Sequence, residues 1–146
     1  MDMKNTTLKT MLVVDDSELL HRMYDLILRR YRDSGTRILH ARNGSEALSM
    51  IRSDAIDVML LDVNMPVMSG TQLMVDLRAS SLLSDLKVIM VSTEGREADI
   101  TVALQNGAIG YVTKPFTPVD LYSLIERYFP TEAPTGGFSL KRGSFV

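Results

Sequence analysis

The stretch LLDVNMPVMSG, residues 60–70, holds the features that decide the fold. It begins as an aliphatic run, reaches the carboxylate of Asp62, and continues into an Asn, a Pro and a Gly. Continuous apolar runs are typical of strands that are buried on both faces of a parallel sheet. The sequence therefore predicts a buried strand that ends at Asp62 and a loop that follows it, and the function depends on which other side chains reach the same place.

Similar aliphatic runs recur along the chain, and each is followed by a segment with helical spacing. The runs cover residues 11–14, 37–41, 58–61, 87–91 and 109–112. The helical segments begin near Ser17, Gly44, Ser69, Arg96 and Thr117. This alternation is the signature of βα units around a parallel sheet. We expect an α/β fold with five strands in a doubly wound (βα)5 sandwich.

The sequence also predicts the length of the first helix and the limits of the domain. Apolar residues at three- and four-residue steps predict one continuous helix from Ser17 to Tyr31, ended by the turn residues 33–35. The βα units fill one domain, residues 10–129, after an N-terminal extension, residues 1–9. Residues 130–146 are rich in Gly, Ser, Thr and Pro and are expected to form a flexible tail.

Composition restricts the function. The 146 residues are 45% apolar and 23% charged, with a net charge of −2, and no basic block predicts nucleic-acid binding. No signal peptide or membrane span is evident, so we expect a cytoplasmic protein that does not insert into membranes. The absence of cysteine excludes thiolate chemistry and cysteine zinc sites. The two histidines, His21 and His40, lie far apart in the sequence and are interpreted as ordinary helix and strand residues.

Polar side chains follow four of the five predicted strands. They are Asp15 and Asp16, then Asp62, then Ser92 and Thr93, and finally Thr113 and Lys114. In an open parallel sheet the ligand site lies beyond the carboxyl ends of the strands. Each residue alone is equally explained as a helix cap, a turn residue or a solvated charge. Together they predict one site.

The three carboxylates in this group would repel one another without a counter-ion. Oxygen ligands favour a hard cation, and a few carboxylates beside a phosphate suit Mg²⁺. A carboxylate beside Mg²⁺ is able to attack phosphorus and form an aspartyl phosphate. Asp62, alone at the end of its strand, is the predicted nucleophile, and Asp15 and Asp16 are predicted to hold the metal.

The sequence resembles a known family in four motifs that together span about residues 8–129. They read VVDDS at 13–17, LLDVNMPVMSG at 60–70, VIMVSTEG at 88–95 and GYVTKPF at 110–116. These motifs are similar to those of the receiver domain of two-component response regulators, especially the single-domain chemotaxis type. The resemblance implies a flavodoxin-like fold with strand order 2-1-3-4-5. It also implies a cis peptide bond between Lys114 and Pro115.

The resemblance implies a role for each site residue. Asp62 would accept a phosphoryl group from a histidine kinase. Asp16, Asp62 and the backbone carbonyl of Asn64 would ligate Mg²⁺, with Mn²⁺ as a substitute, and Asp15 would act through a metal-bound water. The protein would then be a phosphoacceptor switch rather than an enzyme, although it would assist its own phosphotransfer and dephosphorylation.

Further residues would read the phosphoryl group and limit its lifetime. Ser92 and Lys114 would bind it, and Tyr111 would turn inward as the switch. Asn64 and Glu94 would tune the access of the hydrolytic water.

The resemblance also implies an output surface on the fourth helix, fifth strand and fifth helix of the (βα)5 pattern. Its members would include Ile100, Leu104, Tyr111 and Tyr122. The expected partners are the histidine kinase, an output protein such as a flagellar motor switch component, and a phosphatase. The protein would otherwise be a monomer.

Other functions remain open at this level. The alternatives to a chemotaxis switch are a phosphorelay intermediate, a phosphate sink, or the receiver part of a truncated multidomain regulator. A Mg²⁺-dependent phosphatase of the haloacid dehalogenase type is disfavoured, because such enzymes place a second acid at the position of Asn64. A nucleotide-binding module is weaker still, since neither glycine-rich phosphate motif occurs.

Overall fold

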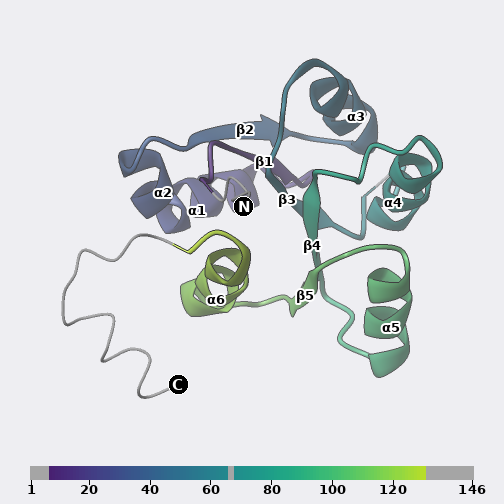
Figure 1. Ribbon diagram of the computed structural model, residues 1–146. Helices are drawn as coiled ribbons and strands as arrows, with labels where there is room; N and C mark the ends of the chain where they lie inside the picture. The colour runs from purple at the N-terminus through teal and green to yellow at the C-terminus, as the bar shows by residue number, and fades with distance from the viewer. Residues whose placement is uncertain (1–6, 66–67, 131–146) are drawn as a thin grey trace.

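The computed structural model describes residues 7–65 and 68–130 of the chain (Figure 1). Of the expected N-terminal extension, only residues 7–9 belong to this part. The expected tail, apart from Pro130, lies outside the described residues, as do Pro66 and residue 67 in the loop after Asp62. The domain itself is described from its first strand to its last helix.

A single parallel sheet with the order β2-β1-β3-β4-β5 forms the centre, as predicted. Its strands are β1 (Thr10–Val14), β2 (Arg37–Ala41), β3 (Val58–Asp62), β4 (Lys87–Ser92) and β5 (Gly110–Thr113). Every residue of β1 and β3 is buried, whereas β2 at the edge is mostly half-exposed. Asp62 lies opposite Val91 and Ser92 lies opposite Thr113, so the carboxyl ends of the inner strands are aligned.

Helices cover both faces of the sheet. They are α1 (Glu18–Ile27), α2 (Arg29–Asp33), α3 (Gly44–Ser53), α4 (Gly70–Ala79), α5 (Glu97–Gln105) and α6 (Pro118–Tyr128). Figure 1 shows α1, α2 and α6 on one face and α3, α4 and α5 on the other. Each face has its own apolar core, one built around Tyr24, Leu28 and Leu121 and the other around Leu73, Met74 and Leu77. No helix among the described residues is long and apolar enough to cross a membrane.

Side-chain caps fix where several helices begin. The hydroxyl of Ser17 accepts a hydrogen bond from the backbone N–H of Leu20, and Ser69 does the same for Gln72. Thr117 and Asp120 form a reciprocal capping box at the start of α6. Because each capped helix follows closely on a strand, the loops between them are held at the carboxyl edge of the sheet.

The continuous first helix predicted from Ser17 to Tyr31 is wrong in one respect. The chain leaves the α-helical pattern at Leu28, which has φ −92° and ψ 7°, and α2 starts at Arg29. Tyr24, Leu28 and Tyr31 are nevertheless all buried in the same core. The apolar pattern therefore runs across the break and does not reveal it. As a result, the fourth and fifth helices of the (βα)5 pattern are α5 and α6.

Candidate functional site

The acidic pair lies directly after β1. The backbone N–H of Asp15 donates to the carbonyl of Ala41 on β2 at 3.2 Å, which continues the sheet by one residue. The Asp15 carboxylate is buried and accepts a hydrogen bond from the backbone N–H of Ser17 at 2.9 Å. Asp16 is exposed. The turn into α1 thus fixes one carboxylate inside the site and leaves the other open to solvent.

Asp62 is the last residue of β3 and is 3% exposed. One of its oxygens accepts a hydrogen bond from the backbone N–H of Asn64 at 3.3 Å. Gly70 allows the following loop to fold back, because a Cβ at that position would lie 2.4 Å from the carbonyl oxygen of Asp62. The backbone of Gly70 therefore lies directly against the end of β3, where its N–H also donates to the carbonyl of Val63 at 2.9 Å.

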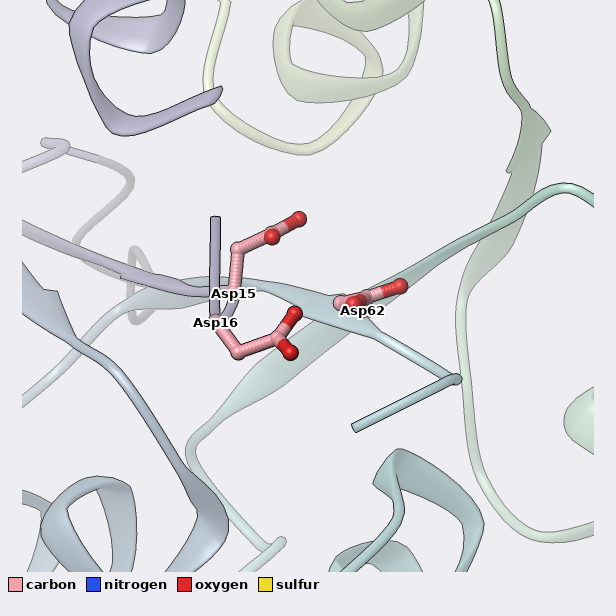
Figure 2. Close-up of side chains that lie close together, drawn as sticks. All are labelled: Asp15, Asp16 and Asp62. Atoms are coloured by element: carbon pink, nitrogen blue, oxygen red, sulfur yellow. The ribbon is translucent and has the colours of Figure 1, made fainter. Parts of the chain in front are cut away.

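Carboxylate oxygens of Asp15, Asp16 and Asp62 lie within 4.8 Å of one another, and Figure 2 shows the three side chains around one gap. This arrangement confirms the predicted cluster. Hard oxygen donors at this spacing fit a divalent cation such as Mg²⁺, which retains water for its remaining positions. The residues present therefore suit the metal that the sequence predicted.

Lys114 reaches the cluster from the end of β5. Its Nζ lies 3.2 Å from Asp15 Oδ2 and 3.2 Å from Asp62 Oδ1. The backbone N–H of Lys114 donates to the carbonyl of Ser92 at 2.7 Å, and the peptide bond between Lys114 and Pro115 is cis, as predicted. The ammonium group thus bridges the ends of β1 and β3, with which β5 shares no edge in the sheet.

Burial and charge shift two pKa values in the cluster. Burial and the neighbouring Asp15 raise the pKa of the Asp62 carboxyl, and Lys114 only partly opposes them. Burial alone would lower the pKa of Lys114, but the two carboxylates outweigh it, so the pKa is raised. Lys114 therefore stays protonated at neutral pH, and its positive charge does not fully offset the unfavourable ionisation of Asp62.

Ser92 and Glu94 lie beside Asp62 at the end of β4. Ser92 is fully buried, and its hydroxyl accepts a hydrogen bond from the backbone N–H of Glu94 at 3.0 Å. The Tyr111 hydroxyl donates to the backbone carbonyl of Glu94 at 2.6 Å. A cavity of about 310 Å³ is lined by these residues together with Asn64 and Val102. Ser92, Glu94 and Tyr111 thus line one cavity.

The structure separates the residues predicted for the output surface. Leu104 is exposed, and Ile100 and Tyr111 are half-buried on α5 and β5. Tyr122 belongs elsewhere, because its hydroxyl donates to the backbone carbonyl of Ile27 at 2.6 Å. Its ring also packs against Tyr31 on α2. The assignment of Tyr122 to the output surface was therefore wrong: this side of α6 faces α1 and α2.

Sequence reasoning also missed a contact between the two histidines. His21 on α1 and His40 on β2 meet through their Nδ1 atoms at 2.6 Å, and His21 Nε2 lies 2.7 Å from the backbone carbonyl of Asp15. They are therefore not independent helix and strand residues. Their sequence positions, one shortly after the acidic pair and one near the end of the neighbouring strand, are the only signal that could have suggested it.

Known proteins share both the fold and the sequence pattern. A model of the response regulator receiver domain matches residues 11–126. The chain is 40% identical over 119 residues to the chemotaxis protein CheY of Pseudomonas aeruginosa, covering 81% of this chain and 94% of the relative. It is 35% identical over 127 residues to a CheY homolog of Campylobacter jejuni, covering 86% of this chain and 96% of that relative.

Among solved structures, the chemotaxis response regulator CheY4 of Vibrio cholerae superimposes with a TM-score of 0.73 at 32% identity, covering 84% of this chain and 99% of that chain. A CheY-like receiver domain protein of Methanospirillum hungatei gives 0.71 at 30% identity, covering 83% and 93%. The family model covers all five strands except Thr10, and it includes the acidic cluster. The chain belongs to the response regulator receiver domain family, of the CheY type, and is thus a component of two-component response regulation.

Proposed function

We propose that Asp62 accepts a phosphoryl group from the phosphohistidine of a kinase and that the phosphorylated domain binds a protein target. One observation carries the proposal: a buried carboxylate at a strand end lies beside two further carboxylates and is bridged by a lysine ammonium. In the transfer, an Asp62 oxygen bonds to phosphorus, the bond from phosphorus to the histidine nitrogen breaks, and the imidazole leaves with that electron pair.

The residues around Asp62 would have separate roles in binding the metal and the phosphoryl group. Asp16, Asp62 and the carbonyl of Asn64 would hold Mg²⁺, or Mn²⁺ in its place, and Asp15 would hold one of its waters. The metal supplies positive charge to the phosphoryl oxygens. Lys114, already 3.2 Å from Asp62, would pair with another of these oxygens.

Ser92 would donate a further hydrogen bond to the phosphoryl group. Its oxygen accepts from the Glu94 amide, which leaves the hydroxyl proton free to be donated to a phosphoryl oxygen. A shift of Ser92 towards the phosphate would enlarge the adjoining cavity, and the Tyr111 ring would move into it after releasing the Glu94 carbonyl. Phosphorylation would thereby favour one of two states of the face formed by Ile100, Leu104 and Tyr111.

We propose that the partner of this face is a protein of the chemotaxis machinery. The relatives named above are chemotaxis proteins, which favours a flagellar motor switch component as the target. Phosphorelay transfer or phosphate storage would use the same Asp62 without such a target, as would the receiver part of a longer regulator. We further propose that the unphosphorylated domain acts as a monomer and that a phosphatase assists its return.

Labelling with acetyl phosphate tests the acceptor. We expect up to one phosphoryl group per chain, dependent on Mg²⁺, and complete loss of labelling in Asp62→Asn. Asp57→Asn is a matched control, because Asp57 accepts from the backbone N–H groups of Lys9 and Thr10 at the opposite end of the sheet. Labelling that persists in Asp62→Asn would contradict the proposal, and sustained turnover of a phosphate ester would favour a phosphatase instead.

The phosphoaspartate is expected to be short-lived, with hydrolysis in seconds to minutes. Asn64 and Glu94 are both exposed and line the cavity next to Ser92, so we expect water to reach the phosphorus from this side. Covering this approach in Asn64→Leu should prolong the lifetime, as measured by loss of label after removal of acetyl phosphate. A half-life of many hours in the unmodified protein with Mg²⁺ would contradict this prediction.

A further inference from the structure

Three side chains outside the phosphorylation chemistry form a connected row that ends at the acidic pair. His21, on α1, is 3% exposed, and its Nε2 lies 2.7 Å from the backbone carbonyl of Asp15. Its Nδ1 lies 2.6 Å from Nδ1 of His40 on β2. Nε2 of His40 in turn lies 2.9 Å from a carboxylate oxygen of Asp25, whose side chain is 49% exposed. The row thus leads from solvent to the metal site.

Hydrogen-bond chemistry gives this row a direction. A backbone carbonyl only accepts, so Nε2 of His21 carries the proton that is donated to Asp15. The carboxylate of Asp25 also only accepts, so Nε2 of His40 carries a proton as well, and the two Nδ1 atoms share one further proton between them. The tautomer of one imidazole is set by the bond that its other nitrogen makes. The Asp15 carbonyl and the Asp25 carboxylate thus hold both Nε2 atoms as donors, and the contact between the Nδ1 atoms links the ring of His21 to the ring of His40.

We propose that Asp25, His40 and His21 are positioning residues for the metal site, acting through the peptide that joins Asp15 to Asp16. The inference rests on the Mg²⁺ binding proposed above. The carbonyl that accepts from His21 belongs to this peptide, so the hydrogen bond fixes the orientation in which Asp16 leaves the strand. Asp16 is exposed, so the burial that fixes Asp15 and Asp62 does not restrain it.

The backbone geometry supports this role. The backbone N–H of Asp15 donates to the carbonyl of Ala41 at the end of β2. The backbone carbonyl of Asp15 accepts a hydrogen bond from His21 on α1. His40 precedes Ala41 on the same strand, so strand and helix hold the acidic pair from both sides. Outer hydrogen bonds of this kind orient metal ligands and raise the affinity for the ion.

Two substitutions at one position separate positioning from packing. The amide nitrogen of glutamine reaches the place of a histidine Nε2, whereas the shorter asparagine reaches only that of Nδ1. We expect His21→Asn to raise the Mg²⁺ dissociation constant roughly three- to tenfold, the range for one lost hydrogen bond. His21→Gln should stay within about twofold of the unmodified protein. His40→Gln, which removes the ring nitrogen that meets Nδ1 of His21, should also weaken Mg²⁺ binding.

The dissociation constants would be measured from the backbone amide resonances of Asp16 and Ser17 during Mg²⁺ titration, with melting temperatures taken in parallel. Thr36→Val is the matched control. It removes a hydrogen bond of 2.9 Å from a buried side chain to the backbone carbonyl of Leu8, far from the site. We expect this variant to lose stability and to keep its Mg²⁺ affinity.

The outcomes separate the two proposals. A His21→Asn or His40→Gln variant with unchanged Mg²⁺ affinity would overturn the positioning role, as would equal weakening in His21→Gln and His21→Asn. If His21→Asn fails to fold, the test uses the side-chain Nε2–H resonance of His21 in the unmodified protein. This resonance must shift as Mg²⁺ binds. A resonance that stays constant during the titration would overturn the positioning role. Absence of Mg²⁺ binding by the unmodified protein would overturn the metal site itself and the inference with it.

Discussion

Replacement of Lys114 by methionine is expected to lower the free energy of unfolding by about 2 kcal/mol in metal-free buffer. The Lys114 ammonium lies 3.2 Å from both Asp15 and Asp62, and these carboxylates are 1% and 3% exposed. Methionine preserves most of the volume but leaves two buried negative charges without their cation. We place the cost below that of a fully buried pair because the Lys114 side chain retains 21% exposure. Chemical denaturation in the presence of a chelator measures it.

Addition of Mg²⁺ should restore much of the loss in Lys114→Met, because a divalent cation can take over the neutralisation of the carboxylates. Lys87→Met is the matched control. Lys87 lies at the start of β4, with its Nζ 5.8 Å from the centre of the Tyr128 ring, and its replacement should cost only about 0.5 kcal/mol. Equal destabilisation of the two variants, or no response of Lys114→Met to Mg²⁺, would show that Lys114 does not balance the acidic site.

The location of the site could be predicted from the sequence because parallel strands bring their carboxyl ends to one edge. Lys114 and Asp62 are 52 positions apart, yet each follows an apolar run, and strand alignment alone brings them together. The strand order came from the family resemblance rather than from the apolar pattern. The metal ligation by the Asn64 carbonyl and the inward movement of Tyr111 remain predictions.

The features that were missed depend on helix phase and tertiary packing. The His21–His40 contact requires both the register of β2 against β1, which pairs His40 with Val13, and the rotation of α1 about its axis. Neither is encoded in a local pattern. Tyr122 was misplaced for a similar reason. Leu121 and Ile125 mark the buried stripe of α6, but only packing against α2 decides which flank of that stripe is covered.

Replacement of Asp62 by asparagine should abolish phosphorylation and yet raise the melting temperature in metal-free buffer at neutral pH. Burial and Asp15 raise the pKa of Asp62 above its ordinary value of 3.8. A carboxyl whose pKa is raised by folding costs stability once it ionises. The cost is absent below the unfolded-state pKa, grows as the pH rises to the folded-state pKa, and is constant above it. The advantage of Asp62→Asn should therefore shrink as the pH falls towards 3.8.

Asp57→Asn is the control that distinguishes relief of a buried charge in Asp62→Asn from a general effect of removing a negative charge. Asp57, just before β3, accepts hydrogen bonds from the backbone N–H groups of Lys9 and Thr10 at 2.8 and 2.9 Å. Its replacement by asparagine removes charge from a satisfied acceptor and should lower the melting temperature. Mg²⁺ should stabilise the unmodified protein more than Asp62→Asn, because the variant lacks one ligand. If Asp62→Asn melted below the unmodified protein without metal, the acidic cluster would be stabilising the fold, and the electrostatic reason for a bound cation would be lost.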